Sequence, residues 1–211
     1  MAEGSDERLY RQQTAAERRA DRRERLLGAA LSSFGTRGYQ LSSIEHLCGA
    51  AGISTRNFYE EFRGKEELLA TLHDVLNDRA FDAAVTAIAD IDPEDLPARA
   101  RAGVAAYFKV MTSDPRWARI ALVESVGVSS EVEAHRRAAL DRFAALIETE
   151  ADRLAEVGVI PRRDYSLTAI ALVGAIQELV MTWTTRRDWD AVIDDVVTEG
   201  ARLIVAAVES P

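Results

Sequence analysis

The chain has 211 residues, of which 47% are hydrophobic and 29% charged, and its formal net charge is −9 at pH 7. This balance is typical of a soluble globular protein and excludes an intrinsically disordered chain. No apolar run reaches the roughly 18 residues that a membrane span needs, and the N-terminus lacks the apolar segment of a signal peptide. A single cysteine, Cys48, excludes an internal disulfide, so the sequence predicts a cytoplasmic protein without membrane association.

The charge is unevenly distributed along the chain. Residues 8–65 carry 11 basic and 6 acidic side chains, whereas residues 66–211 carry 15 basic and 26 acidic ones. A polyanion would be attracted to the N-terminal part and repelled by the rest, which would orient the molecule on it. The alternative interpretation is that an asymmetry of this size arises by chance.

Helical periodicity runs through nearly the whole chain, and no segment shows the alternation of a half-buried strand. Ser42 and Glu45 form a capping-box pattern at the start of one short helix, and Gly52 ends it. Ser54 is placed to cap the next helix. The sequence predicts an all-α fold of about nine helices, over residues 18–34, 42–51, 54–62, 65–91, 93–112, 114–126, 130–157, 165–186 and 189–209.

Three of these helices precede residue 65, and the second and third are joined by the tight turn Ala51-Gly52-Ile53-Ser54. This is the pattern of a helix-turn-helix, in which one helix crosses the DNA backbone while the next enters the major groove by its N-terminal end. The small core that fixes their angle is predicted to contain Leu47, Ala51, Ile53, Phe58 and Phe62. The outer face of the third helix then carries side chains suited to bases and phosphates, namely Thr55, Arg56, Asn57 and Tyr59.

The stretch from Leu26 to Leu69 resembles the N-terminal domain of the tetracycline-repressor (TetR) family of transcriptional regulators. The matching features are Leu26-Leu27-Gly28-Ala29-Ala30-Leu31-Ser32-Ser33-Phe34, Gly38-Tyr39, Ser42-Ser43-Ile44, Ala51-Gly52-Ile53-Ser54, Phe58-Tyr59-Glu60-Glu61-Phe62 and Lys65-Glu66-Glu67-Leu68. The resemblance implies a sequence-specific DNA-binding regulator that acts without a cofactor. Repressor is the family default, with release from a palindromic operator when a small effector binds the C-terminal domain; an activator stays open.

The predicted domains follow from this resemblance and from the change in composition near residue 65. They are a basic N-terminal arm at residues 1–17, possibly disordered, a helix-turn-helix domain at residues 18–64, and a ligand-binding and dimerisation domain at residues 65–211. The arm and the first helix hold Arg8, Arg11, Arg18, Arg19, Arg22, Arg23 and Arg25. They suit an arm that follows the minor groove or the phosphates. The alternative is a solvated helix face, because acidic residues are interleaved with them.

The DNA contacts are carried over from the resemblance by position. Ser43 would contact phosphate, Tyr59 would pack against the DNA backbone, and Lys65 would bind a phosphate at the start of the fourth helix. The predicted DNA-binding set is Ser42, Ser43, Ser54, Thr55, Arg56, Asn57, Tyr59 and Lys65. The chain departs from the family pattern at three carboxylates. Glu61 stands where the family usually has His or Tyr near phosphate, Glu60 is also placed to face the groove, and Glu45 stands where a basic residue sometimes reads DNA.

The last two predicted helices are apolar nearly all round, so both of their sides need to be covered. This pattern predicts a homodimer, as does the resemblance, with interface residues Ile170, Val173, Ile176, Val180, Val196 and Leu203. The alternative is a buried helical hairpin in a monomer. A two-fold dimer would read a roughly palindromic operator.

The middle helices hold aromatic and apolar residues where the resemblance implies a ligand pocket. The predicted ligand-binding set is Tyr107, Phe108, Met111, Trp117, Leu122, Phe143, Leu146 and Gln177. Taken singly, each aromatic residue is better interpreted as part of an ordinary core. Taken together, they predict a mostly apolar cavity for an aromatic or lipid-like effector.

An enzyme is disfavoured because HExxH, CxxC and GxSxG patterns are absent from the sequence and its three histidines are isolated. The sequence predicts no catalytic residues, no metal site and no cofactor. Gly35-Thr36-Arg37-Gly38 matches the GXXG loop of an RNA-binding fold, but no strands flank it, and a helix-stop turn is the better interpretation. The alternative function is an all-helical dimeric scaffold protein without DNA readout.

Overall fold

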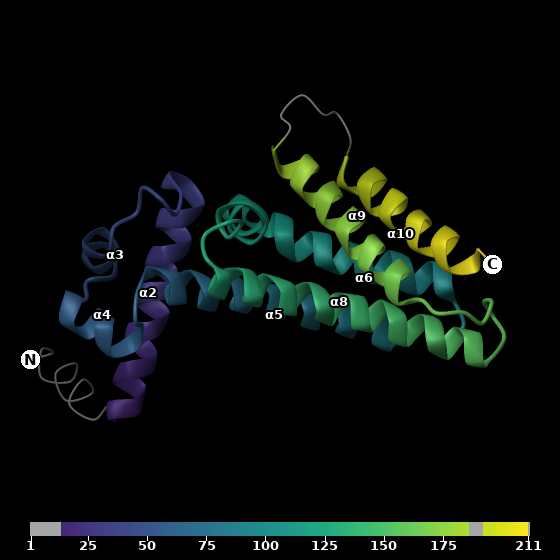
Figure 1. Cartoon of the computed structure of the whole chain (residues 1–211), viewed down its shortest axis with the longest axis horizontal. Coiled ribbons are helices and arrows are strands. Elements are labelled where there is room, and N and C mark those ends of the chain that lie inside the picture. Colours follow the sequence, from purple (N-terminus) through teal and green to yellow (C-terminus); the bar gives the residue numbers. More distant parts are fainter. Residues whose placement is uncertain (1–13, 186–191, 211) are drawn as a thin grey trace, which may run out of the picture.

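The computed structural model describes residues 14–185 and 192–210, and these contain nine α-helices, one π-helical turn and no strand. The all-α prediction is confirmed. Figure 1 shows a small lobe at one end and a larger bundle at the other. The lobe comprises α2 (Ala15–Arg37), α3 (Ile44–Ala51) and α4 (Thr55–Glu61). The bundle comprises α5 (Lys65–Ala89), α6 (Leu96–Ser113), α7 (Pro115–Arg119), the π-helical turn η1 (Ile120–Glu124), α8 (Ser130–Glu156), α9 (Ser166–Thr185) and α10 (Ile193–Glu209).

The first helix starts earlier than the sequence pattern predicted. Thr14 caps α2 in a capping box, because its hydroxyl accepts from the backbone N–H of Glu17 and the Glu17 carboxylate accepts from the backbone N–H of Thr14. The helix therefore begins at Ala15 and includes the end of the segment that we predicted as an arm. The rest of that arm, residues 1–13, lies outside the described residues.

Capping residues determine where the two short helices of the lobe, α3 and α4, begin and end. Gly52 ends α3 in the left-handed conformation, with φ at 63°, and its backbone N–H bonds the last carbonyls of the helix. Ser43 caps α3 in place of the predicted Ser42, and Ser54 caps α4 as predicted. The five residues predicted for the small core are all buried, namely Leu47, Ala51, Ile53, Phe58 and Phe62.

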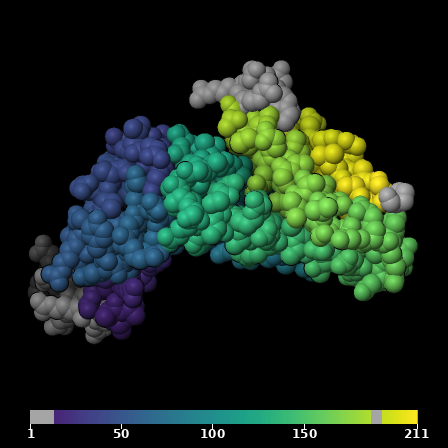
Figure 2. All heavy atoms as spheres, viewed as in Figure 1, coloured from purple at the N-terminus to yellow at the C-terminus, as the bar shows by residue number. Residues whose placement is uncertain are grey.

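The lobe and the bundle share α5 and meet again at α7 and η1. α2 packs against both of these elements, and the loop after α2 is bonded to them: the backbone N–H of Tyr39 donates to Glu124 Oε2 at 2.7 Å. Arg119 donates to Glu124 Oε1 at 2.9 Å and to the carbonyl of Thr36 at 3.1 Å. Figure 2 shows the resulting bent molecule, in which the lobe and the bundle join at the middle.

The helix α9 has the length and mean hydropathy of a membrane span, 1.4 over its 18-residue window, which the sequence analysis did not recognise. One such helix is weak evidence for a membrane protein. Only 28% of that window is buried inside the chain, so an apolar face of α9 is left uncovered. Its most exposed large side chains are Leu167 and Ile170, at 79% and 52%.

Two glycines of α2 test the packing of the lobe against the bundle. A Cβ on Gly35 would lie 2.4 Å from Arg116 Cβ and 3.2 Å from Arg116 Cα, whereas a Cβ on Gly28 would meet nothing within 4 Å. We expect Gly35→Ala to destabilise the protein by about 1–3 kcal/mol through overpacking of α2 against α7. Gly28→Ala should stabilise it by about 0.5–1 kcal/mol, because alanine is the better helix former.

Urea unfolding followed by circular dichroism, at one fixed protein concentration, measures both changes. If both substitutions shifted the free energy of unfolding in the same direction, the close approach of α7 to α2 would be contradicted.

Candidate nucleic-acid interface and ligand cavity

The helix α4 presents its N-terminal half to solvent. Ser54 caps the helix by accepting a hydrogen bond from the backbone N–H of Asn57 at 3.2 Å. The Arg56 side chain is 89% exposed and Tyr59 is 56% exposed, while Thr55 is exposed and Asn57 is half-buried. The structure thus brings these five predicted residues together in one uncovered segment at the end of the lobe.

The neighbouring serines at the start of α3 differ in exposure. Ser43 is exposed, and its Oγ accepts from the backbone N–H of His46 at 3.1 Å. Ser42 is only 1% exposed, and its hydroxyl donates to the carbonyl of Gly38 at 2.8 Å and accepts from Ser33 at 2.7 Å. The structure contradicts a direct DNA contact by Ser42, because its hydroxyl is used to close the turn between α2 and α3.

Lys65 holds the same turn from the start of α5. Its Nζ donates to the carbonyls of Tyr39 and Ser42, each at 2.9 Å, and lies 4.1 Å from the centroid of the Tyr39 ring. Burial lowers the pKa of Lys65. Two of its three donor protons are therefore directed into the protein, and one is left for an outside acceptor.

The carboxylate of Glu61, which we expected near phosphate, is turned inward. Its side chain has no exposed area. Arg19 Nε donates to Oε2 at 3.0 Å, and Arg22 Nη2 donates to Oε1 at 2.6 Å. Burial alone would raise the pKa of Glu61, but the hydrogen bonds and charges of Arg22 and Arg19 outweigh it and lower the pKa. Glu61 does not oppose a phosphate; it fastens the end of α4 to α2.

Two further arginines of α2 bind the backbone of the helix-turn-helix. Arg23 donates to the carbonyl of Glu61 at 2.9 Å, and Arg25 Nη2 donates to the carbonyls of Ala51 and Gly52 at 2.5 and 2.9 Å. The sequence analysis missed this role because the contacts join distant positions. Arg8 and Arg11 lie outside the described residues, so the N-terminal arm remains a prediction.

The other two carboxylates of the motif stay at the surface. Glu60 is half-exposed, and its oxygens lie 3.6 Å from Arg56 Nε and 3.8 Å from Arg22 Nη2. Glu45 is exposed at the start of α3, where its own backbone N–H and then the Ser43 hydroxyl lower its pKa by hydrogen bonding. Glu60 therefore competes with any DNA group for Arg56.

A cavity of about 130 Å³ lies inside the bundle between α5, α6, α8, α9 and α10. Its wall is almost wholly aliphatic and aromatic. Four of the predicted ligand residues line it, namely Tyr107, Phe143, Leu146 and Gln177. The Tyr107 hydroxyl is buried without a hydrogen bond in the described chain, and burial raises its pKa; Gln177 lies near it without bonding geometry.

The other four predicted ligand residues do not line the cavity. Phe108, Met111 and Leu122 are buried in the core that packs α6 against α7, η1 and α9. Trp117 packs against the core of the lobe instead. This cavity does not support these four residues as ligand contacts. Successive positions of one helix point about 100° apart, so Phe108 cannot face the space that its neighbour Tyr107 lines.

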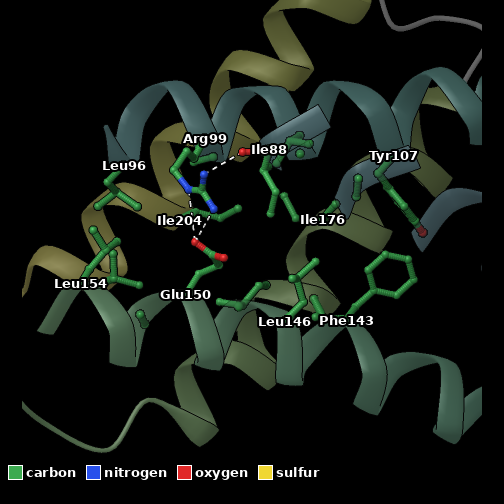
Figure 3. A pocket seen from close by; sticks show the side chains of 18 of the residues that line it. Ile88, Leu96, Arg99, Tyr107, Phe143, Leu146, Glu150, Leu154, Ile176 and Ile204 are labelled. Atoms are coloured by element: carbon green, nitrogen blue, oxygen red, sulfur yellow. Dashed lines mark hydrogen bonds and ion pairs between the residues drawn. The ribbon is translucent and has the colours of Figure 1, made fainter. Parts of the chain in front are cut away.

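The wall of the cavity also contains one ion pair, between Arg99 and Glu150, which sequence analysis missed. Arg99 of α6 donates to Glu150 Oε2 of α8 through Nε at 3.2 Å and Nη2 at 2.7 Å (Figure 3). Its Nη1 also donates to the carbonyls of Ile88 and Ile91 at the end of α5, at 2.7 and 2.9 Å. No pattern in the sequence joins these positions, which are 51 residues apart.

The predicted dimer residues are mostly buried within the chain. Val173, Ile176, Val180 and Val196 are 8% exposed or less and belong to the intrachain core. Ile170 is exposed and Leu203 is half-buried. The four buried residues are therefore excluded from an interface. The outer side of α10 is polar and not apolar, since it carries the Arg101–Asp194 and Arg202–Glu199 ion pairs.

An all-helical chain with a helix-turn-helix lobe and an apolar cavity in its larger bundle has the architecture of a ligand-responsive transcriptional regulator. The family model for bacterial regulatory proteins of the tetR family matches residues 26–72. The HTH-type transcriptional regulator EthR of Mycolicibacterium smegmatis is 32% identical over 151 residues, which cover 68% of this chain and 67% of EthR. The chain belongs to the TetR family of transcriptional regulators.

Solved structures share the fold over most of the chain. The fatty acid degradation regulator FadR of Bacillus halodurans superposes with a TM-score of 0.78 at 19% identity, covering 90% of this chain and 97% of FadR. FadR of Bacillus subtilis, solved in complex with stearoyl-CoA, superposes with a TM-score of 0.75 at 18% identity, covering 88% and 97%.

The buried Glu61 predicts a pH dependence of stability. Its pKa is lower in the folded than in the unfolded chain, so the stabilisation is present above the unfolded pKa and is lost as pH falls through the folded pKa. We expect Glu61→Gln to lower the free energy of unfolding at pH 7 by about 1–3 kcal/mol. The loss of stability between pH 7 and pH 4 should be smaller in this variant than in the wild type.

Glu24→Gln is the matched control, because Glu24 is an exposed glutamate of α2, the helix that carries the arginine partners of Glu61. Urea unfolding at pH 4, 5 and 7 compares the three proteins. A Glu61→Gln variant with the pH profile of the wild type would contradict the inward anchor.

Proposed function

We propose that this regulator is a cytoplasmic homodimeric repressor that binds a roughly palindromic operator and releases it when a small, mostly apolar effector enters the bundle. The observation that carries the proposal is the uncovered segment of α4, residues 54–59, capped by Ser54 and held by inward contacts at its other end. Its arginine and asparagine can read guanine and adenine in the major groove. The excess of basic side chains in residues 8–65 draws this end toward DNA.

The proposed DNA contacts differ from the sequence prediction in two residues. Ser42 is left out because its hydroxyl is buried. Lys65 acts mainly by positioning the turn before α3, with one proton left for a phosphate. The proposed set is Ser43, Ser54, Thr55, Arg56, Asn57 and Tyr59.

The uncovered face of α9 supports the proposed homodimer. Its exposed positions follow helical spacing and form one stripe, made of Leu167, Ile170, Ala171, Gly174 and Glu178. Small residues in the middle of the stripe permit a close approach of a second helix. Two copies joined by a two-fold axis would present two α4 helices to two half-sites.

The effector proposal rests on the cavity. Its volume of about 130 Å³ is close to the ~150 Å³ of an apolar cavity that holds one benzene ring. The B. subtilis FadR structure holds stearoyl-CoA, whose acyl chain is apolar as well, although it is much longer than a ligand that this cavity would hold. The cavity touches the end of α5 through Ile88, and α5 begins with Lys65 in the DNA-binding lobe. If an effector lowers the affinity of the protein for DNA by some factor, bound DNA must lower the affinity for the effector by the same factor.

The DNA interface is tested by Arg56→Ala, which removes a side chain that is 89% exposed. We expect it to weaken operator binding by about 5- to 150-fold, because a bidentate pair with guanine contributes about 1–3 kcal/mol. Fluorescence anisotropy with a duplex selected from random sequences measures the affinity. The control is Arg137→Ala, which removes an exposed arginine of α8. If the wild type selected no duplex, the scaffold alternative would replace this proposal.

The dimer is tested by Ile170→Glu. A carboxylate in the centre of an apolar interface leaves a buried charge without a partner, so the variant should be mainly monomeric at concentrations where the wild type is dimeric. Light scattering after size-exclusion chromatography measures the mass of each. Val157→Glu, at a residue 57% exposed just after α8, is the control and should remain dimeric. A monomeric wild type, or a dimeric Ile170→Glu variant, would count against α9 as the interface.

A further inference from the structure

The only ionised side chains on the described wall of the cavity are Arg99 and Glu150. Arg99 is 11% exposed and Glu150 28% exposed, so the pair is largely shielded from water, and most of its neighbours on the cavity wall are apolar. A charged group in such a place is costly unless it is paired and hydrogen-bonded. The number of hydrogen bonds that each side chain already makes therefore indicates which hydrogen bonds it can still form with an effector.

Arg99 has little capacity left for a ligand. Both protons of Nη1 are bonded to the carbonyls of Ile88 and Ile91, and Nε and Nη2 each donate to Glu150 Oε2. Four of its five N–H groups are thus taken. A carboxylate ligand would have to displace Glu150 from a guanidinium that the end of α5 holds in place.

Glu150 is satisfied at one oxygen only. All of its hydrogen bonds within the described chain, two from Arg99 and one from Arg153 at 3.1 Å, go to Oε2. Its other oxygen, Oε1, accepts none from those residues. Figure 3 shows this oxygen on the side of the carboxylate away from Arg99, toward the apolar middle of the pocket. At this point the cavity therefore offers a free hydrogen-bond acceptor, and the remaining Nη2 proton of Arg99 is the one donor left on the pair.

Charge decides between a neutral and a cationic donor. Two guanidinium groups, of Arg99 and Arg153, already surround the single carboxylate. An added ammonium ion would make the cluster more positive and would lose its hydration in an apolar space. A neutral hydroxyl or amide N–H pays a much smaller desolvation cost and forms a charge-assisted hydrogen bond with Oε1.

We propose that the effector is a neutral, largely apolar molecule about the size of a six-carbon chain or ring, whose hydroxyl or amide N–H donates a hydrogen bond to Glu150 Oε1. The inference rests on the proposed effector cavity and specifies the chemistry that it selects. Glu150 is a specificity-determining residue in this proposal, and Arg99 positions it.

Two isomeric probes test the proposal, hexan-1-ol and 1-methoxypentane. They have the same atoms and similar volume, but only the alcohol is a donor. Isothermal titration calorimetry with the full-length protein should show hexan-1-ol binding about tenfold more tightly, as expected for a hydrogen bond to a charged group. Hexanoate and hexylamine, of equal chain length, should bind more weakly than hexan-1-ol.

Variants connect the preference to Glu150. Glu150→Gln keeps an oxygen but loses the charge, so the preference should fall to about threefold, and Glu150→Met should abolish it while 1-methoxypentane still binds. Circular dichroism checks that both variants are folded. Glu148→Gln, on the same helix but not lining the cavity, is the control and should keep the tenfold preference.

The outcomes separate this proposal from the proposed function. Equal binding of the two isomers, or tightest binding of hexanoate, overturns the donor proposal and leaves the cavity as an effector site. Loss of the preference in Glu148→Gln as well as in Glu150→Gln also overturns the role of Glu150. No binding of any probe up to its solubility limit overturns the effector cavity and this proposal together.

Discussion

The orientation of α4 depends on the ion pairs that bind Glu61 to Arg19 and Arg22. A helix of seven residues is too short to be stable alone, because its few backbone hydrogen bonds do not offset the cost of nucleation. Ser54 satisfies its first turn, and the arginines of α2 hold its last residue. A carboxylate in this position costs desolvation, and the partly exposed guanidinium groups keep that cost low. The exposed residues between the two ends can then be read as a fixed surface rather than a flexible segment.

The turn between α2 and α3 is the second fixed point, since both parts of the molecule bond it. On one side the backbone N–H of Tyr39 donates to Glu124, which ends the π-helical turn η1. On the other side Lys65 donates to the carbonyls of Tyr39 and Ser42. π-helical turns are rare and often mark functional positions. The bundle thus contacts the helix-turn-helix through short polar bonds as well as through the apolar core, and a shift of either element changes the support of α3.

The sequence predicted the helices and the small core well because both follow local rules. Helical periodicity, capping serines and the Gly52 turn are read within a few residues, and Leu47 or Phe58 could only face inward. Contacts between positions far apart in the sequence could not be predicted in this way. Glu61 was interpreted as a surface carboxylate because its partners lie about 40 positions away. The pair of Glu150 and Arg99 was missed for the same reason. The choice among aromatic residues failed for a different reason. Phe108 and Tyr107 are adjacent and both aromatic, and only the packing of α6 decides which one lines the cavity.

The helix α5 joins the helix-turn-helix lobe to the proposed effector cavity. At its N-terminal end Lys65 holds the turn before α3, and at its C-terminal end Arg99 holds the carbonyls of Ile88 and Ile91. A 25-residue helix is about 37 Å long and transmits displacement at one end to the other. Arg99 is held in turn by Glu150, the residue that faces the cavity with a free oxygen. In the proposed mechanism, a ligand bonded to Glu150 would act through one arginine on the far end of the helix whose first residue, Lys65, bonds the turn of the helix-turn-helix lobe.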